Sequence, residues 1–274
     1  MLRFFRIIRR SLLELSQVRT YFFYAIGEIA LVVIGILIAL QVNNWNEERN
    51  DSRQINLYLE NLAKTLHEEI DNYKRMASLN AYRYNGLQYL LEISGNEKIN
   101  HDPIPIDTFS SMVLKHLGEE ERYNTVHWKN DFPDTYNTEF IIECFRVTMT
   151  IGFATLNPSV YEEMKSTGLM SKIGNNDLKK AINEYYTFVY ALLDRNGDWN
   201  ERLTFTWQEF LMDRYNVVLD GRFVIGDPIP LLDDPDVISR IQIMVGPAMF
   251  RATNSYRAIE LAEKILAEME NGRD

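Results

Sequence analysis

A continuous apolar segment near the N-terminus constrains this chain more than any other feature of its sequence. Residues 21–42 read YFFYAIGEIALVVIGILIALQV, with one acid, Glu28, and one amide, Gln41. A helix of this length rises about 33 Å, which is enough to cross a bilayer core of about 30 Å. The sequence therefore predicts one transmembrane helix.

Two other interpretations fit this segment less well. A cleavable signal peptide has an apolar core of about 7–15 residues that ends in small residues at the cleavage site. This segment is longer and ends in LQVNNW, without such a site. A buried core helix is usually shorter and amphipathic. The length of the segment favours the transmembrane interpretation.

The charges on either side of the segment predict its orientation. Residues 1–20 contain five arginines and one glutamate, whereas asparagines and acids follow residue 42. Positively charged flanks stay in the cytoplasm. We therefore divide the chain into a basic cytoplasmic or interfacial leader, residues 1–20, a transmembrane helix, residues 21–42, and a helical extracytoplasmic domain, residues 43–274.

The charge of the outer domain limits its partners. Residues 43–274 contain 24 Lys and Arg against 37 Asp and Glu, a net charge of −13. An acidic domain is repelled by an anionic bilayer, and it offers no basic stripe for the phosphates of a nucleic acid. The bilayer is thus an expected partner and nucleic acid is not.

Cys144 is the one cysteine, so it forms no internal disulfide and is expected to be a buried small hydrophobe.

The periodicity of the outer domain predicts an all-α fold. No proline or glycine occurs between residues 43 and 85, so the apolar helix is expected to continue to about Ile93 and to stop near Ser94 to Asn96. Apolar residues at steps of three and four form a seam, typical of a packed helical hairpin and, less commonly, of a self-associating coiled coil. The seam residues are Ile55, Leu59, Leu62, Leu66, Ile70 and Tyr73.

The rest of the chain also reads as helices joined by loops. Asp107 can cap a short helix, and residues 118–137 read as a loop. Further helices are predicted over residues 138–153, from an Asn157 cap to an interruption at Gly168, from Asp177 to Tyr215, and over two C-terminal segments separated at Gly246 and Pro247, with a loop over residues 220–236. Part of residues 146–153 is rich in β-branched residues and is a possible strand.

Glu28 is the most unusual residue of the apolar segment. An ionised carboxylate inside a bilayer costs several kcal/mol unless it is paired, protonated or hydrated. Gly35 and Ala39 lie within about 20° of Glu28 around a helix, and their small side chains allow another helix to approach closely. We expect Glu28, Gly35 and Ala39 to form a helix-packing face. The alternatives are a proton-carrying Glu28 and a carboxylate near the cytoplasmic interface with no special role.

No motif in the sequence specifies an enzyme. His67 and His116 each have an acid four residues later, but no HExxH or CxxC accompanies them. The acids around Asp194 lack the glycine and the final glutamate of a calcium loop. Nucleophile-elbow and phosphate-binding glycine motifs are missing from the sequence as well. We therefore predict no catalytic residue, metal ligand or cofactor.

Two segments of the chain resemble an uncharacterised family of single-pass membrane proteins of Gram-negative bacteria. The first is YAIGEIALVVIGILIALQVNNWNEER, followed by a leucine-rich amphipathic helix. The second is YEEMKSTGLMSKIGNNDLKKAINEYY, residues 161–186, which is similar to a helix–glycine–helix segment in the same order in that family. The resemblance implies an inner-membrane anchor with a helical periplasmic domain. It brings no activity, ligand or catalytic residue.

Three functional hypotheses remain open at this point. The first is a non-enzymatic, membrane-anchored interaction or scaffold protein, which forms a homo-oligomer or binds another membrane protein through its transmembrane face. The second is a periplasmic ligand-sensing domain that acts on a partner through the membrane helix. The third is a membrane-tethered hydrolase with an unrecognised site. A polar pocket in the outer domain favours the second, and a cleft with accessible carboxylates or histidines favours the third.

Overall fold

The computed structural model describes residues 16–99, 102–106, 132–149, 156–220 and 223–271. The short helix predicted after Asp107 lies outside these residues, as do most of the predicted 118–137 loop and residues 150–153 of the possible strand. The chain divides into two compact units, Met1–Leu57 and Tyr58–Asp274.

Helix α2 (Ser16–Ile93) is the longest element of the chain, and it ends where the sequence predicted. Within the first unit it carries a stretch that is long and apolar enough to cross a membrane. The large apolar side chains described from Phe22 to Val42 are 47–74% exposed.

The second unit is built around the last part of α2. Every side chain from Ala77 to Leu91 is buried, so this segment has no solvent-facing side. Helices usually keep a polar face in water, and a helix buried all round belongs to the interior of a domain. The sequence nevertheless places five polar residues in it: Ser78, Asn80, Arg83, Asn85 and Gln88.

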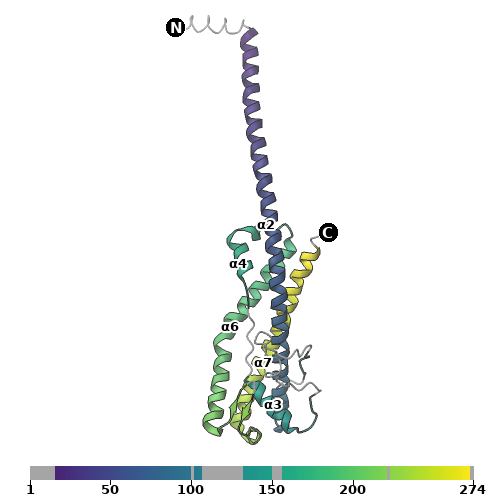
Figure 1. The fold of residues 1–274 in the computed structure, drawn as a ribbon, viewed down its shortest axis with the longest axis vertical. Coiled ribbons are helices and arrows are strands. Elements are labelled where there is room, and N and C mark those ends of the chain that lie inside the picture. Colours follow the sequence, from purple (N-terminus) through teal and green to yellow (C-terminus); the bar gives the residue numbers. More distant parts are fainter. Residues whose placement is uncertain (1–15, 100–101, 107–131, 150–155, 221–222, 272–274) are drawn as a thin grey trace, which may run out of the picture. The chain divides into compact units, whose positions relative to one another are not determined.

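The elements that follow are mostly helical, and the predicted all-α fold is confirmed (Figure 1). They are α3 (Thr138–Thr148), α4 (Ser159–Ser166), α5 (Leu169–Lys172), α6 (Asn176–Tyr215), the 3-10 helix η2 (Ile229–Asp233) and α7 (Pro235–Asn271). Two short strands, β1 (Val218–Leu219) and β2 (Val224–Ile225), pair antiparallel; β2 lies in the predicted 220–236 loop and β1 just before it.

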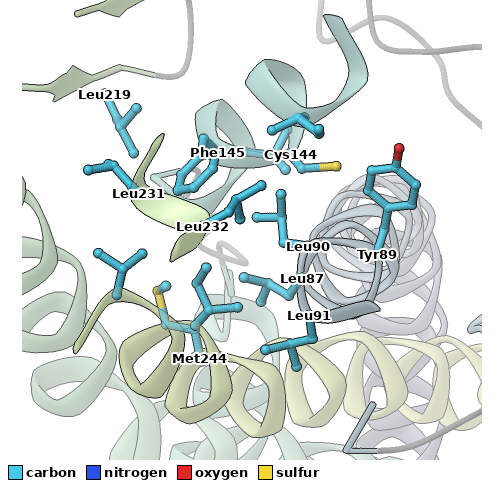
Figure 2. Close-up of a cluster of buried hydrophobic side chains, with 14 of the residues drawn as sticks. Leu87, Tyr89, Leu90, Leu91, Cys144, Phe145, Leu219, Leu231, Leu232 and Met244 are labelled. Carbon is cyan, nitrogen blue, oxygen red and sulfur yellow. The ribbon is translucent and has the colours of Figure 1, made fainter. Parts of the chain in front are cut away.

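Apolar side chains from α2, α3, η2 and α7 form the main core of this unit. Figure 2 shows Leu87, Leu90 and Leu91 of α2 close to Leu232 and Met244. Cys144 of α3 is fully buried in this cluster, as expected, and burial raises the pKa of its thiol. A side chain on Gly86 would approach Cys144 Sγ to 3.2 Å, so the glycine allows α2 and α3 to lie close together.

Caps confirm two predicted boundaries and correct a third. Gly168, with a φ of 75°, separates α4 from α5. Asn175 Oδ1 accepts hydrogen bonds from the N–H groups of Asp177 and Leu178 and starts α6. The predicted Asn157 cap is wrong by one residue, because Pro158 holds the cap position of α4 and makes no side-chain bond. Asn157 Oδ1 still accepts the N–H of Ser159 at 3.3 Å, and its own N–H donates to Glu69 on α2.

The predicted break at Gly246 and Pro247 is also wrong, since α7 continues through both residues. Proline within a helix removes one backbone donor and disturbs the preceding turn. The neighbouring side chains of Met244, Val245 and Ala248 are all buried in the core. Burial of apolar side chains on both sides of the proline outweighs this local cost.

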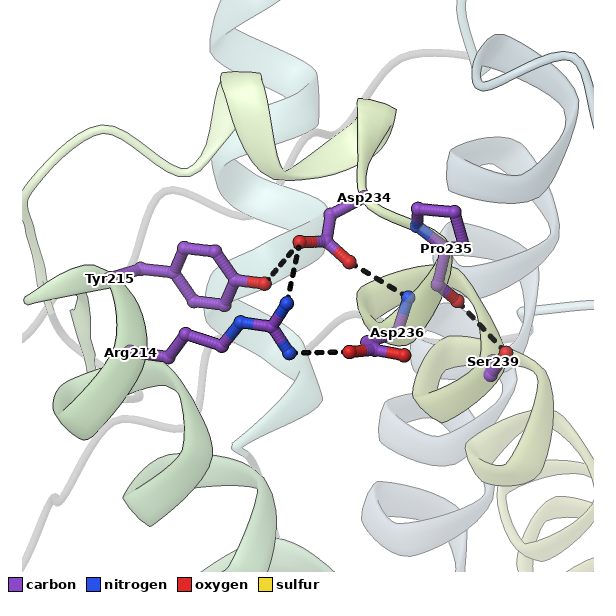
Figure 3. A network of polar contacts seen from close by, with 6 residues as sticks. All are labelled: Arg214, Tyr215, Asp234, Pro235, Asp236 and Ser239. Atoms are coloured by element: carbon purple, nitrogen blue, oxygen red, sulfur yellow. Dashed lines mark hydrogen bonds and ion pairs between the residues drawn. The ribbon is translucent and has the colours of Figure 1, made fainter.

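A polar network joins the end of α6 to the start of α7 (Figure 3). Tyr215 donates its hydroxyl hydrogen to Asp234, and Arg214 forms ion pairs with Asp234 and Asp236. Asp234 also accepts the N–H of Asp236 at 2.8 Å, which satisfies a donor in the first turn of α7. Arg214 and Asp236 are exposed, so their ion pair aligns the two helix ends and contributes little to stability.

We predict that Gly246→Ala stabilises the protein by about 0.5–1 kcal/mol, because alanine favours a helix interior and its Cβ would meet no atom within 4 Å. The matched control is Gly226→Ala, which should destabilise the protein. Gly226 has a φ of 88°, and an added Cβ would lie 3.0 Å from the carbonyl oxygen of Asn216. Chemical unfolding of the full chain in detergent, followed by circular dichroism, measures both changes. A loss of stability in Gly246→Ala would contradict the account of α7.

Candidate functional site

A pocket of about 330 Å³ lies beside the buried segment of α2. We call it the α2 pocket. Its walls come from α2, from the chain that follows α2, and from the residues that precede α3. They are Tyr84, Asn85, Gln88, Tyr89, Glu92, Lys98, Asp102, Pro103, Phe132, Pro133 and Asp134.

The amide side chains of α2 hold one wall of the pocket in place. Asn85 Nδ2 donates to the carbonyl oxygen of Ile104 at 2.9 Å, and Ile104 N–H donates to Asn85 Oδ1 at 3.0 Å. Gln88 Oε1 accepts the N–H of Ile99 at 3.2 Å, and its Nε2 donates to the hydroxyl of Tyr84. Buried polar side chains of α2 thus form hydrogen bonds with backbone groups of the irregular segment that follows the helix.

Tyr89 holds the opposite wall. Its hydroxyl donates to the carbonyl oxygen of Thr135 at 2.8 Å and accepts the N–H of Asn137 at 3.1 Å. Asn137 is the cap of α3, where its Oδ1 accepts the N–H of Phe140. The ring centroids of Phe132 and Phe140 are 4.9 Å apart. The wall is therefore fixed to both α2 and α3.

The charge on the pocket is negative. Three carboxylates line it, and one ammonium group, Lys98, pairs with Glu92 at 2.6 Å. The remaining two acids are Asp102 and Asp134, which are exposed. Together with the rings of Tyr84, Tyr89 and Phe132, these acids favour a ligand with a positive charge and an apolar body.

A second polar site lies at a buried carboxylate on α2. Glu69 is 2% exposed. Its Oε2 accepts the hydroxyl hydrogen of Tyr185 on α6 at 2.6 Å, and its Oε1 accepts the N–H of Asn157 at 2.8 Å. Burial raises the pKa of Glu69, and the two hydrogen bonds oppose this rise without cancelling it. Glu69 thus connects α2, α6 and the start of α4.

The structure places the predicted site residues in different surroundings. Glu28, Gly35 and Ala39 lie on the exposed part of α2, and a side chain added to Gly35 would meet no atom within 4 Å. Leu59 in the seam is half-buried. The other seam residues are buried: Ile55, Leu62, Leu66, Ile70 and Tyr73. The predicted packing face remains a prediction.

The α2 pocket was not identified from the sequence. Neither Asn85 nor Gln88 belongs to a sequence motif that predicts a binding site. The one signal in the sequence is that these two amides interrupt a run rich in tyrosine and leucine, from Ala81 to Leu91. Among the described residues, no group of three or more His, Cys, Asp or Glu side chains is arranged to hold a metal ion.

Comparison with protein families gives one match, to a family of unknown function, DUF6090, over residues 28–125. Neither the curated proteins nor the solved structures include a match to the chain. The matched range contains most of the apolar stretch and all five α2 residues of the pocket. The second segment on which the resemblance was based, residues 161–186, lies outside it.

We predict that Glu69→Gln changes how stability depends on pH. Because the folded-state pKa of Glu69 is raised above its unfolded value, protonation stabilises the folded state. That contribution is fully present below the unfolded pKa and is lost as the pH rises through the folded pKa. The native chain should therefore lose stability relative to Glu69→Gln between about pH 4 and neutral pH. Urea midpoints at several pH values measure the difference, with exposed Glu68→Gln as the control. A difference that stays constant with pH would contradict this account.

Residues 28–125 of this chain resemble an uncharacterised protein family, which confirms the resemblance inferred from the sequence and assigns no activity to it.

Proposed function

We propose that this protein is a membrane-anchored interaction protein that acts by binding other proteins and not by catalysis. The observation that carries this proposal is the exposure of the apolar part of α2. Its large side chains are exposed on every side of the helix, and no other part of the described chain covers them. An apolar surface of this size favours a lipid environment over water.

The same helix then enters the buried interior of the second unit. In this proposal the leader lies in the cytoplasm, and the second unit lies in the periplasm of a Gram-negative bacterium, anchored to the inner membrane. The arginines of residues 1–20 and the acidic composition of residues 43–274 support this orientation.

Association in the membrane would use the face formed by Glu28, Gly35 and Ala39. These residues share one side of α2, and Gly35 presents no side chain there. A second helix can approach closely at such a position, and Glu28 would then hydrogen-bond across the contact. The occupant is a second copy of this chain or another membrane protein.

Ligand sensing is a second candidate function, and the α2 pocket is the observation that favours it. The pocket lies on the same helix as the apolar stretch, so a bound ligand would act directly on α2. Its charge and aromatic walls favour a small organic cation. Under this hypothesis, tetramethylammonium or a primary amine raises the melting temperature of the full chain, whereas sodium at equal ionic strength does not. Asp134→Asn should weaken the effect, and equal responses to all cations would reject the hypothesis.

We predict that Gly35→Ile weakens association, because a branched side chain at this position separates two closely packed helices. Glu28→Leu should weaken it as well by removing the hydrogen bond, whereas Glu28→Gln should preserve it. The matched control is Gly27→Ile, since Gly27 is also exposed and lies about 80° around the helix from Gly35. Crosslinking in membranes and a membrane two-hybrid assay measure association. Unchanged association in both Gly35→Ile and Glu28→Leu would reject this face as an interface.

A further inference from the structure

Two buried arginines of the second unit have very different surroundings. Arg146 on α3 is 7% exposed, and its guanidinium donates to both carboxylate oxygens of Glu143, at 2.7 and 2.5 Å. Arg83 on α2 is 3% exposed, and its Nε is completely buried without a hydrogen-bond partner. Arg83 has no ion pair with any described residue. A buried charge without a partner strongly destabilises a fold, so this guanidinium requires an explanation.

The surroundings of Arg83 add positive charge. Arg251 on α7 is 9% exposed and lies close enough to lower the pKa of Arg83 by charge repulsion. Burial has the larger effect, and together they lower this pKa to about 10. Arg83 therefore still carries its charge at neutral pH. A buried guanidinium that feels the charge of a second one attracts an anion.

An unpaired acceptor lies one turn away from Arg83. Asn80 is 1% exposed, and its Nδ2 donates to the carbonyl oxygen of Met76 at 2.9 Å. Its Oδ1 is buried and accepts no hydrogen bond. Asn80 and Arg83 are three positions apart and therefore neighbours on one side of α2. An unpaired donor thus lies beside an unpaired acceptor in the same interior region.

We propose that Arg83 and Asn80 bind a protonated oxyanion, such as a phosphate group, between α2 and α7. Oxygens of the anion would accept from the guanidinium of Arg83, Arg251 would add attraction, and the acidic hydroxyl of the anion would donate to Asn80 Oδ1. The buried residues of α7 within one turn of Arg251 are small: Ala248, Ala252 and Ser255. Arg83 itself lies about 140° around the helix from Gln88 of the α2 pocket.

Inorganic phosphate is the probe that tests this site. The full chain in detergent is unfolded thermally with phosphate, sulfate or chloride at equal ionic strength. Phosphate at ten times its dissociation constant should raise the melting temperature by about 3–6 °C. Sulfate has no hydroxyl hydrogen near neutral pH and should raise it less, and chloride should raise it least. No shift with phosphate would overturn the proposal, and an equal shift with sulfate would overturn the role of Asn80.

Two substitutions separate this site from a structural role of Arg83. Arg83→Met removes the unpaired charge, so it should raise the melting temperature without phosphate and abolish the phosphate shift. Asn80→Asp supplies a carboxylate beside Arg83 and should have the same two effects. A full phosphate shift in either variant would overturn the proposal, as would a lower melting temperature of Arg83→Met without phosphate.

The chain offers a matched control for each substitution. Arg146→Met should lower the melting temperature, because it removes the ion pair with half-buried Glu143, and it should keep the phosphate shift. Asn85→Asp should also lower it and keep the shift, because a carboxylate cannot donate to the carbonyl oxygen of Ile104. Loss of the phosphate shift in both controls would show that the shift does not report on Arg83, and would overturn the site.

Discussion

Burial of α2 from Ala77 to Leu91 on all sides is the constraint on which the second unit depends. A helix with no solvent-facing side must find partners for its polar side chains within the protein. Asn85 and Gln88 find them in the backbone of the segment after α2, and Tyr89 finds them at the start of α3. These bonds shape the α2 pocket, so the pocket is a consequence of how a polar helix is buried. In the same segment the Nε of Arg83 and the Oδ1 of Asn80 are buried without a hydrogen-bond partner.

The elements with strong local signals could be predicted from the sequence. Gly168 separates two helices through its own backbone conformation, and the start of α6 at Asn176 lies one residue from the predicted Asp177. The uninterrupted run up to Ile93 likewise predicted one long helix, and the leucine seam indicated which side of it would be buried. Cys144 was identified as a buried residue because it lies within an apolar helical run.

The features that depend on long-range contacts could not be predicted. Gly246 and Pro247 were predicted to separate two helices, but packing of their neighbours in the core keeps α7 continuous. Asn157 was predicted from local signals as a cap, and its Oδ1 does accept the N–H of Ser159, but the bond from its own N–H to Glu69, 88 positions earlier in the chain, could not be predicted. The burial of Asn80, Arg83, Asn85 and Gln88 follows from contacts with other elements, and amphipathic periodicity places such residues in water. For this reason both candidate ligand sites became visible only in the folded structure.

Cysteine labelling of spheroplasts tests the proposed membrane anchor most directly. Single cysteines are introduced at Ser11, Ile34 and Ser94 of a Cys144→Ala chain, and each variant is treated with a membrane-impermeant maleimide. The account predicts that Ser94→Cys reacts in intact spheroplasts, that Ser11→Cys reacts only after the membrane is permeabilised, and that Ile34→Cys stays unreacted until detergent is added. Reaction of Ile34→Cys in intact spheroplasts, or of Ser11→Cys before permeabilisation, would contradict it.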